Sequence, residues 1–95
     1  MVINGLKINY IDEGAGEPVL FLHGWGSSIL PFTNLINTLK PTHRVVALDF
    51  PGCGQSQTME TPWDINDYCD FVLEFIKKSH FIFLATFICI FIVGK

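Results

Sequence analysis

Short runs of apolar residues alternate along the chain with stretches of helical spacing. Residues 19–22 are four consecutive apolar residues, and residues 44–48 are apolar after Arg44. Uninterrupted apolar runs of this length are typical of strands that are buried on both faces, as in a parallel sheet. We therefore predict buried strands over these two ranges and a further strand over the apolar residues 81–84.

A helix is predicted between the first two buried strands. Apolar residues recur there at i, i+3, i+4 and i+7, as along the buried face of a helix, at Phe32, Leu35, Ile36 and Leu39. Pro31 suits the first helical turn, where a missing N–H costs nothing, and Pro41 ends the helix.

A second helix is predicted from Asp64 to Ser79. Asp64 suits the N-cap position, and Lys77 and Lys78 stand where the helix dipole favours cations. The apolar face predicted for this helix consists of Ile65, Tyr68, Cys69, Val72, Leu73 and Ile76.

The chain opens with a predicted β-hairpin. Val2 and Ile3 form its first strand, Asn4-Gly5 its turn and residues 6–11 its second strand, because Asn-Gly favours a type I′ turn. Residues 14–18 are a predicted turn. The order is then strand, helix, strand, helix, strand, and right-handed crossovers make this a parallel sheet with helices on its faces. The predicted fold class is a three-layer α/β fold.

Composition narrows the function classes. Ninety-five residues allow one domain, and 49% hydrophobic residues with a net charge of −3 exclude a disordered chain. Six Lys and Arg residues argue against a nucleic-acid partner, since little could contact phosphates. Cys53, Cys69 and Cys89 form no C-x-x-C pair and are typical of free thiols in a reducing cytoplasm. Residues 1–10 lack the apolar core of a signal peptide, so we expect a cytoplasmic location.

Two motifs carry the functional information. Residues 14–26 read Gly-Ala-Gly-Glu-Pro-Val-Leu-Phe-Leu-His-Gly-Trp-Gly, and residues 49–56 read Asp-Phe-Pro-Gly-Cys-Gly-Gln-Ser. Together they resemble the opening of the α/β-hydrolase fold superfamily, and the resemblance covers about residues 1–80. It implies a partial α/β-hydrolase sheet, descent from a serine hydrolase acting on esters or related carbonyl substrates, and no cofactor.

The resemblance also implies roles for individual residues. An oxyanion loop is expected at His23, Gly24, Trp25 and Gly26, with the backbone N–H of Trp25 as the donor. A structural loop is expected at Asp49, Gly52, Gly54 and Ser56. Ser56 follows the wrong strand to be the nucleophile, and His23 precedes any possible nucleophile, so His23 is expected to orient the loop. None of the histidines has a metal-ligand spacing, so no metal site is predicted.

The resemblance breaks after residue 80. Aligning Ala85 with the first glycine of a nucleophile elbow places Phe87 at the nucleophile and Cys89 at the second glycine. Phe cannot attack a carbonyl, and Cys89 among apolar neighbours is interpreted as inert packing. We therefore expect residues 1–80 to be the N-terminal part of a hydrolase domain that is truncated before the elbow, and the chain to be inactive. Residues 81–95 are an apolar tail, either a fifth strand or unrelated sequence.

The apolar tail leaves an alternative open. Residues 81–94 carry no charge, but these 14 residues fall short of the ~20 that a membrane-spanning helix needs. Flanking lysines keep membrane association through residues 81–94 possible. The alternative function is a small membrane-associated or interaction protein that uses residues 81–93. A half-covered sheet with an unpaired edge also predicts self-association.

Overall fold

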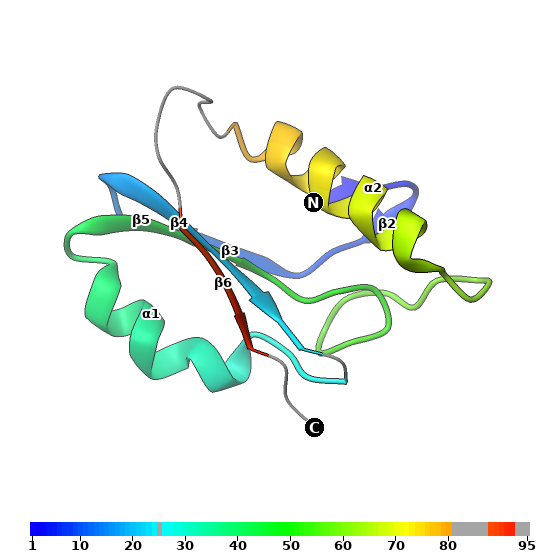
Figure 1. Cartoon of the computed structure of the whole chain (residues 1–95), viewed down its shortest axis with the longest axis horizontal. Helices are drawn as coiled ribbons and strands as arrows, with labels where there is room; N and C mark the ends of the chain where they lie inside the picture. Colours follow the sequence, from blue (N-terminus) through cyan, green and yellow to red (C-terminus); the bar gives the residue numbers. More distant parts are fainter. Residues whose placement is uncertain (25, 81–87, 93–95) are drawn as a thin grey trace.

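A computed structural model describes residues 1–24 and 26–80 and the backbone of residues 88–92 (Figure 1). Its elements, in chain order, are β1 (Val2–Ile3), β2 (Leu6–Lys7), β3 (Tyr10–Glu13), β4 (Glu17–His23), the 3₁₀ helix η1 (Leu30–Phe32), α1 (Thr33–Leu39), β5 (His43–Leu48), α2 (Ile65–Lys78) and β6 (Ile88–Ile92). The two predicted buried strands and both predicted helices are thus present.

Four strands form the main sheet, in the order β3-β5-β4-β6. Strand β4 pairs in parallel with β5 and with β6, whereas β3 runs antiparallel to β5. In the β4–β5 register Leu22 lies opposite Leu48, so the loops that follow these two strands leave the sheet at the same edge.

Strands β4 and β5 are buried on both faces, as their uninterrupted apolar runs predict. Successive residues of β4 and β5 point to opposite sides, and the buried side chains separate into two clusters. The cluster on the α1 side contains Val19, Phe21, Ile29, Phe32, Ile36, Val45 and Ala47. The cluster on the α2 side contains Ile3, Leu6, Ile8, Leu20, Leu22, Val46, Leu48, Phe71 and Phe75. Figure 1 shows α1 and α2 on opposite faces of the sheet, which confirms the three-layer α/β prediction.

The N-terminal segment differs from the prediction of one strand over residues 6–11. Strand β2 pairs with β1, but β3 leaves the hairpin and pairs with β5 in the main sheet. Ile8 still continues the hairpin, because its N–H donates to the Met1 carbonyl at 2.8 Å, whereas the N–H of the next residue, Asn9, donates to Ser56 Oγ at 2.9 Å. Polar contacts from a distant loop therefore divide the predicted strand.

The predicted turn at residues 14–18 is shorter than expected, because Glu17 and Pro18 already belong to β4. Two glycines allow the close turn. A Cβ on Gly14 would lie 2.2 Å from the His43 carbonyl oxygen, and one on Gly16 would lie 2.5 Å from that of Thr42. Both also have positive φ angles, of 85° and 125°, that side chains disfavour.

Helix α2 begins as predicted but is rotated relative to its predicted apolar face. Asp64 is the N-cap, and it forms a capping box in which its side chain accepts from the Asp67 N–H at 3.0 Å and Asp67 Oδ2 accepts from the Asp64 N–H at 2.9 Å. Phe71 and Phe75 are fully buried instead of the predicted Ile65 and Leu73, whose side chains are 73% and 57% exposed.

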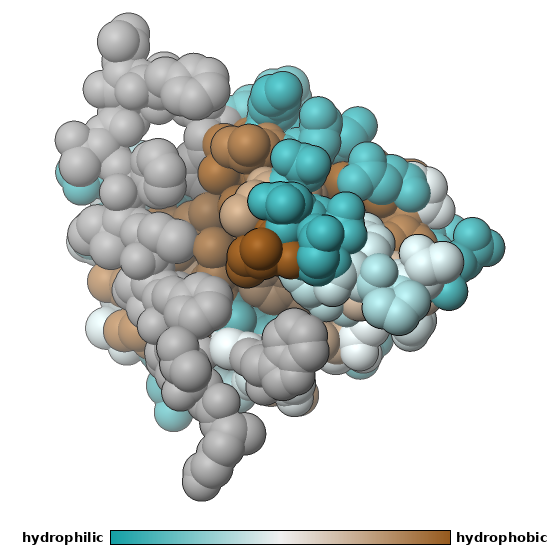
Figure 2. Space-filling view, turned by 45° about the vertical axis from the view of Figure 1, so that its right-hand side comes forward, coloured by the Kyte–Doolittle hydropathy of each residue, from teal (hydrophilic) through white to brown (hydrophobic). Residues whose placement is uncertain are grey.

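The large aromatic side chains explain this rotation. Turning Phe71 and Phe75 toward the sheet buries more apolar area than turning the smaller aliphatic side chains inward. Of the predicted face, Val72 and Ile76 pack against the core at its edge, Tyr68 is half-buried, and Cys69 is exposed. Figure 2 shows one face of the molecule, on which apolar surface, in brown, is bordered by polar surface, in teal.

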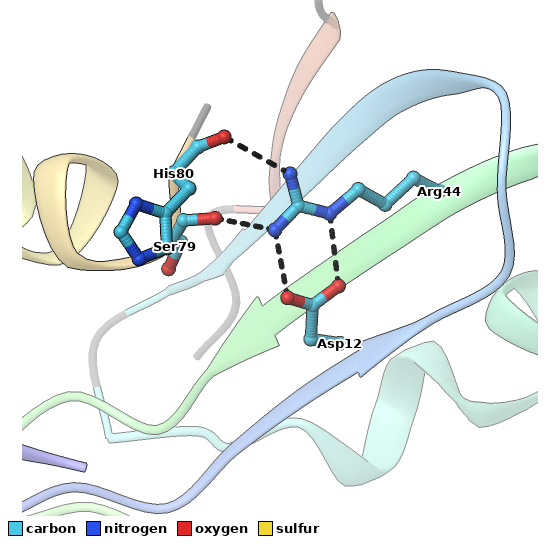
Figure 3. Close-up of polar contacts among 4 residues, drawn as sticks. All are labelled: Asp12, Arg44, Ser79 and His80. Atoms are coloured by element: carbon cyan, nitrogen blue, oxygen red, sulfur yellow. Dashed lines mark hydrogen bonds and ion pairs between the residues drawn. The ribbon is translucent and has the colours of Figure 1, made fainter. Parts of the chain in front are cut away.

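Arg44 on β5 fixes the end of α2 to the sheet (Figure 3). Its Nε and Nη2 atoms donate to Asp12 Oδ1 at 2.9 Å and Oδ2 at 2.7 Å, and this hydrogen bonding raises the pKa of Arg44. The same guanidinium donates to the carbonyl of Ser79 and, at 3.4 Å, to that of His80. Carbonyls at a helix C-terminus lack intrahelical partners, so Arg44 satisfies them while Asp12 on β3 holds it in place.

Several expectations from the sequence concern the C-terminal region and a membrane-spanning helix. The strand predicted at residues 81–84 and the nucleophile alignment of Phe87 lie outside the described residues. Cys89 lies within β6, opposite Leu20, so it does not follow the carboxyl end of a strand as the elbow alignment requires. Among the helices of the described residues, none is long and apolar enough to cross a membrane.

Candidate functional site

The candidate site lies where β4 and β5 end. Strand β4 ends at His23 and β5 at Leu48, and Asp49 follows directly. Because these strands are parallel and in register, the loop after each emerges beside the other. The carboxyl edge of an open parallel sheet is where ligands of such folds bind.

His23 joins the two loops. Its Nε2 accepts the backbone N–H of Phe50 at 2.9 Å, so Nδ1 carries the proton and donates to the Gly24 carbonyl at 2.8 Å. The side chain is 3% exposed, and its ring meets that of Phe50 edge to face at 5.0 Å. With both ring nitrogens engaged by backbone groups, His23 orients the loops and leaves no nitrogen for proton transfer.

The turn after His23 is tight. The N–H of Ser27 donates to the Gly24 carbonyl at 3.1 Å, which closes the segment 24–27. Gly24 is buried, and Gly26 is exposed with a φ of +72° that favours glycine. Trp25, the expected oxyanion donor, lies outside the described residues.

Asp49 holds three separate segments together. Its Oδ1 accepts the Ile29 N–H at 2.7 Å, and its Oδ2 accepts the Gln55 N–H and the Asn9 side-chain amide, both at 2.9 Å. The residue is 2% exposed, so these bonds replace the solvation that the carboxylate loses. Both carboxylate oxygens of Asp49 accept hydrogen bonds from residues of the fold, so its role here is structural.

Gly54 and Ser56 complete this loop. A Cβ on Gly54 would lie 2.3 Å from Asp49 Oδ2, so the close approach of the chain to the carboxylate requires glycine. The Ser56 hydroxyl donates to the Asp49 carbonyl at 2.6 Å and accepts the Asn9 N–H at 2.9 Å. Gly52 adopts a φ of +80°. The geometry therefore gives the Ser56 hydroxyl two partners within the fold.

An apolar cavity of about 760 Å³ opens beside the His23 turn. His23, Gly24 and Gly26 form one wall, and residues 50–53 of the second loop form another. The remaining wall comes from residues before and within the first turns of α2: Thr58, Met59, Pro62, Trp63, Ile65 and Tyr68. The sequence analysis did not predict this last wall. The aromatic residues Trp63 and Tyr68, which follow the second motif, could have indicated it.

Cys53 is the one ionisable thiol among the described cavity residues. Burial raises the pKa of the Cys53 thiol, the Asp49 carboxylate raises it further, and a hydrogen bond from the Gly26 backbone opposes both. Burial likewise raises the pKa of Tyr68. Both groups are therefore neutral at physiological pH and add no charge to the cavity.

The described part of the chain contains no group of three or more His, Cys, Asp or Glu side chains placed to hold a metal ion. The described lining of the cavity is mainly aromatic and aliphatic, with the glycines of the two loops beside it. A mostly apolar lining of this kind is typical of small-molecule sites.

Comparison with known proteins identifies the class. The model of the alpha/beta hydrolase fold family matches residues 17–86, so the chain belongs to the α/β-hydrolase fold family. This agrees with the resemblance carried by the two motifs.

Individual relatives include enzymes of several kinds. The chain is 47% identical over 53 residues to a cis-3-alkyl-4-alkyloxetan-2-one decarboxylase from Shewanella oneidensis, covering 56% of this chain and 17% of that protein. It is 36% identical over 63 residues to a soluble epoxide hydrolase from a Corynebacterium species, covering 66% of this chain and 22% of that enzyme. The chain thus spans less than a quarter of the length of either relative.

Solved structures give the same fold. The Cif epoxide hydrolase from Acinetobacter nosocomialis superposes with a TM-score of 0.78 at 26% identity, over 90% of this chain and 27% of that one. This likeness agrees with the α/β-hydrolase fold that the family model gives for the chain.

Proposed function

We propose that this chain supplies the oxyanion-loop side of a serine hydrolase site for esters or related carbonyl substrates. The observation that carries the proposal is the His23–Gly24 turn, fixed to the Asp49–Phe50 loop and bordering an apolar cavity. A rigid turn at this edge suits a backbone N–H that must already point at an oxyanion before the reaction begins.

The proposal extends to the structural loop of residues 49–56. Asp49, Gly52, Gly54 and Ser56 hold the second loop against the first, and none of them reacts with substrate. The bonds of Asp49 to the Ile29 and Gln55 N–H groups support this structural role, because both carboxylate oxygens already accept hydrogen bonds from the main chain.

We further propose that the 95-residue chain by itself hydrolyses no ester. Support comes from the engaged hydroxyl of Ser56 and the engaged imidazole of His23, which leave neither residue as a nucleophile or base. A p-nitrophenyl acetate assay on the purified chain tests this. Turnover above buffer that is lost on Trp25→Pro, which removes the backbone N–H, would contradict it.

The oxyanion role needs a test with a complete catalytic site. Residues 1–80 of this chain can replace the matching segment of the Shewanella decarboxylase, to which the chain is 47% identical over the aligned residues. We expect the chimera to keep the activity of that relative. Trp25→Pro should lower kcat by about 100-fold, the usual loss for one oxyanion donor, and Trp25→Phe, which keeps the N–H, should not. Equal loss in both variants would reject the role.

A second candidate is an interaction or membrane-associated protein that uses residues 81–93, with self-association. The exposed Ile65 and Leu73 side chains favour association, because surface of this kind gains free energy when covered. Light scattering tests it in solution, and carbonate extraction of membranes tests anchoring. A monomer that is fully extracted would reject this candidate.

A further inference from the structure

Helix α2 carries a row of apolar side chains that the fold leaves exposed. Ile65, Cys69 and Leu73 follow one another at intervals of four residues, so they form one ridge along the helix surface, here called the α2 ridge. Ile65 and Leu73 are 73% and 57% exposed, and Cys69 is exposed as well. The half-buried Val72 and Ile76 border this ridge.

The α2 ridge points away from the core. Phe71 and Phe75, which are buried beneath the helix, each lie two residues after a residue of the ridge. Two residues correspond to about 200° around an α-helix, so the buried phenylalanines and the ridge lie on nearly opposite sides. Figure 1 shows α2 as the outer layer on its face of the sheet. The ridge is therefore apolar surface that gains free energy when a partner covers it.

The charges on α2 make this surface complementary to a second copy of itself. The exposed Asp67 and Asp70 lie in the first half of the helix, and the exposed Lys77 and Lys78 lie in its last turn. In an antiparallel pair of these helices, the lysines of each copy approach the aspartates of the other, and opposite ends of the two helix dipoles meet. In a parallel pair, like charges and like dipole ends would meet. Two-fold symmetry makes every favourable contact occur twice.

We propose that two copies of this chain associate through α2, with the helices antiparallel and the α2 ridge of each copy packed against that of the other. Ridges of residues spaced by four interdigitate in the commonest class of helix packing, and the small Cys69 in the middle lets the helices approach. One helix per copy buries less than the ~1,200 Å² of a standard interface, so we expect a reversible dimer with a dissociation constant of about 100 µM. The proposal rests on the second candidate function only for self-association, and it places the contact on α2 in place of residues 81–93.

Sedimentation equilibrium of the full chain measures this association, from about 10 µM to about 1 mM, so that monomer and dimer are both populated. Leu73→Glu should weaken the association about tenfold or more, because a carboxylate loses hydration at two symmetric positions of the interface. Leu30→Glu is the matched control, since Leu30 is 77% exposed but lies in η1, on the opposite face of the sheet. It should leave the dissociation constant unchanged. Circular dichroism should show both variants folded, because neither side chain belongs to the buried core.

Charge exchange tests the antiparallel arrangement. Asp70→Lys and Lys77→Glu should each weaken the association about fivefold, because each substitution brings like charges together twice in the dimer. Lys77 lies 3.8 Å from Glu74 of its own helix in an exposed pair, so its replacement costs the fold little. Both substitutions in one chain should restore the association, because the facing charges are then exchanged. A double variant that stays as weak as the single variants would reject the antiparallel arrangement.

Cys69 reports directly whether the α2 ridge is covered. In dilute protein it is exposed, and iodoacetamide should alkylate it rapidly. At about 1 mM protein most of the chain is dimeric, so we expect the rate per thiol to fall about fivefold. The Leu73→Glu variant is the control, and its Cys69 should react at the same rate at both concentrations.

The outcomes separate the alternatives. A monomer at every concentration would overturn the α2 interface together with the self-association of the second candidate, whereas the oxyanion-loop role is tested independently in the chimera. Association that Leu73→Glu leaves unchanged would overturn the α2 interface alone and favour residues 81–93 as the contact. Equal weakening by Leu73→Glu and Leu30→Glu would overturn it in favour of unspecific apolar association. Slow alkylation of Cys69 even in dilute protein would overturn it as well, because another part of the same chain would then cover the ridge.

Discussion

The imidazole Nε2 of His23 accepts the backbone N–H of Phe50 at 2.9 Å, so one loop of the candidate site satisfies the main chain of the other. Replacing His23 by Phe keeps a ring of similar size but removes the acceptor. It also removes the donor to the Gly24 carbonyl. We expect a loss of about 2 kcal/mol in the free energy of unfolding, measured by urea denaturation, because buried backbone groups lose their partners.

His43 provides the control for this substitution. It lies at the start of β5, and its Nδ1 contacts the exposed Thr42 hydroxyl at 2.8 Å. His43→Phe should change stability by no more than about 0.5 kcal/mol. Equal losses for the two variants would show that the His23 bonds do not matter to folding.

Asp49→Ala should be more costly still. Two backbone N–H groups and the Asn9 amide lose a charged acceptor in a buried setting, so we expect a loss of about 3 kcal/mol. Thermal and urea unfolding measure this loss. The exposed Asp70 is the matched control, and a similar loss for Asp70→Ala would contradict the interpretation.

Gly54→Ala tests the close approach to the Asp49 carboxylate. Gly54 has a φ of +50° and a Cβ there would lie 2.3 Å from Oδ2, so the substitution adds a clash to backbone strain. Gly5 has a φ of +80° with open space around its Cβ position. Gly5→Ala should therefore cost about 1 kcal/mol and Gly54→Ala about 3 kcal/mol in unfolding experiments. Equal costs would indicate that the carboxylate moves aside freely.

A double-mutant cycle tests the pair of Arg44 and Asp12. Both side chains are largely shielded and form two parallel hydrogen bonds, so we expect a coupling of about 1–2 kcal/mol between Arg44→Met and Asp12→Ala. The exposed pair of Lys40 and Glu13, at 3.2 Å, should show a coupling of about 0.3 kcal/mol. Comparable values for the two pairs would contradict a special role for Arg44.

The raised pKa of Cys53 predicts its reactivity. At pH 7–8 its thiolate fraction is small, so iodoacetamide should alkylate Cys53 more slowly than the exposed Cys69, with the rate rising toward alkaline pH. Site-resolved mass spectrometry measures both rates in one sample. Because the pKa in the folded state lies above the unfolded value, the protonated thiol contributes stability at low pH that is lost as pH rises through the folded-state pKa. Faster labelling of Cys53 at neutral pH would contradict this.

Some features of the fold were readable from the sequence because a single local rule determines them. The four-residue run Val19 to Leu22 has no polar position, and a strand with that pattern must be covered on both faces. Asp64 likewise identified the start of α2, since the cap depends on a side chain and the N–H groups just after it.

Other features depended on distant residues and could not be read locally. The division of residues 6–11 results from Ser56, 47 residues from Asn9 along the chain. The rotation of α2 was missed because helical spacing alone does not weigh Phe71 and Phe75 against smaller residues. The cavity wall at Trp63 and Tyr68 arises only when the second loop and α2 pack together.

Arg44, which bonds to the carbonyls at the C-terminal end of α2, also bears on the opposite end of this helix. Its last carbonyls are tied to the sheet, while its first turn, with Ile65 and Tyr68, forms a side of the cavity. Helix α2 therefore connects the contact with Arg44 at its C-terminal end to the cavity wall at its N-terminal end. The position of one cavity wall thus depends in part on a guanidinium that does not line the cavity.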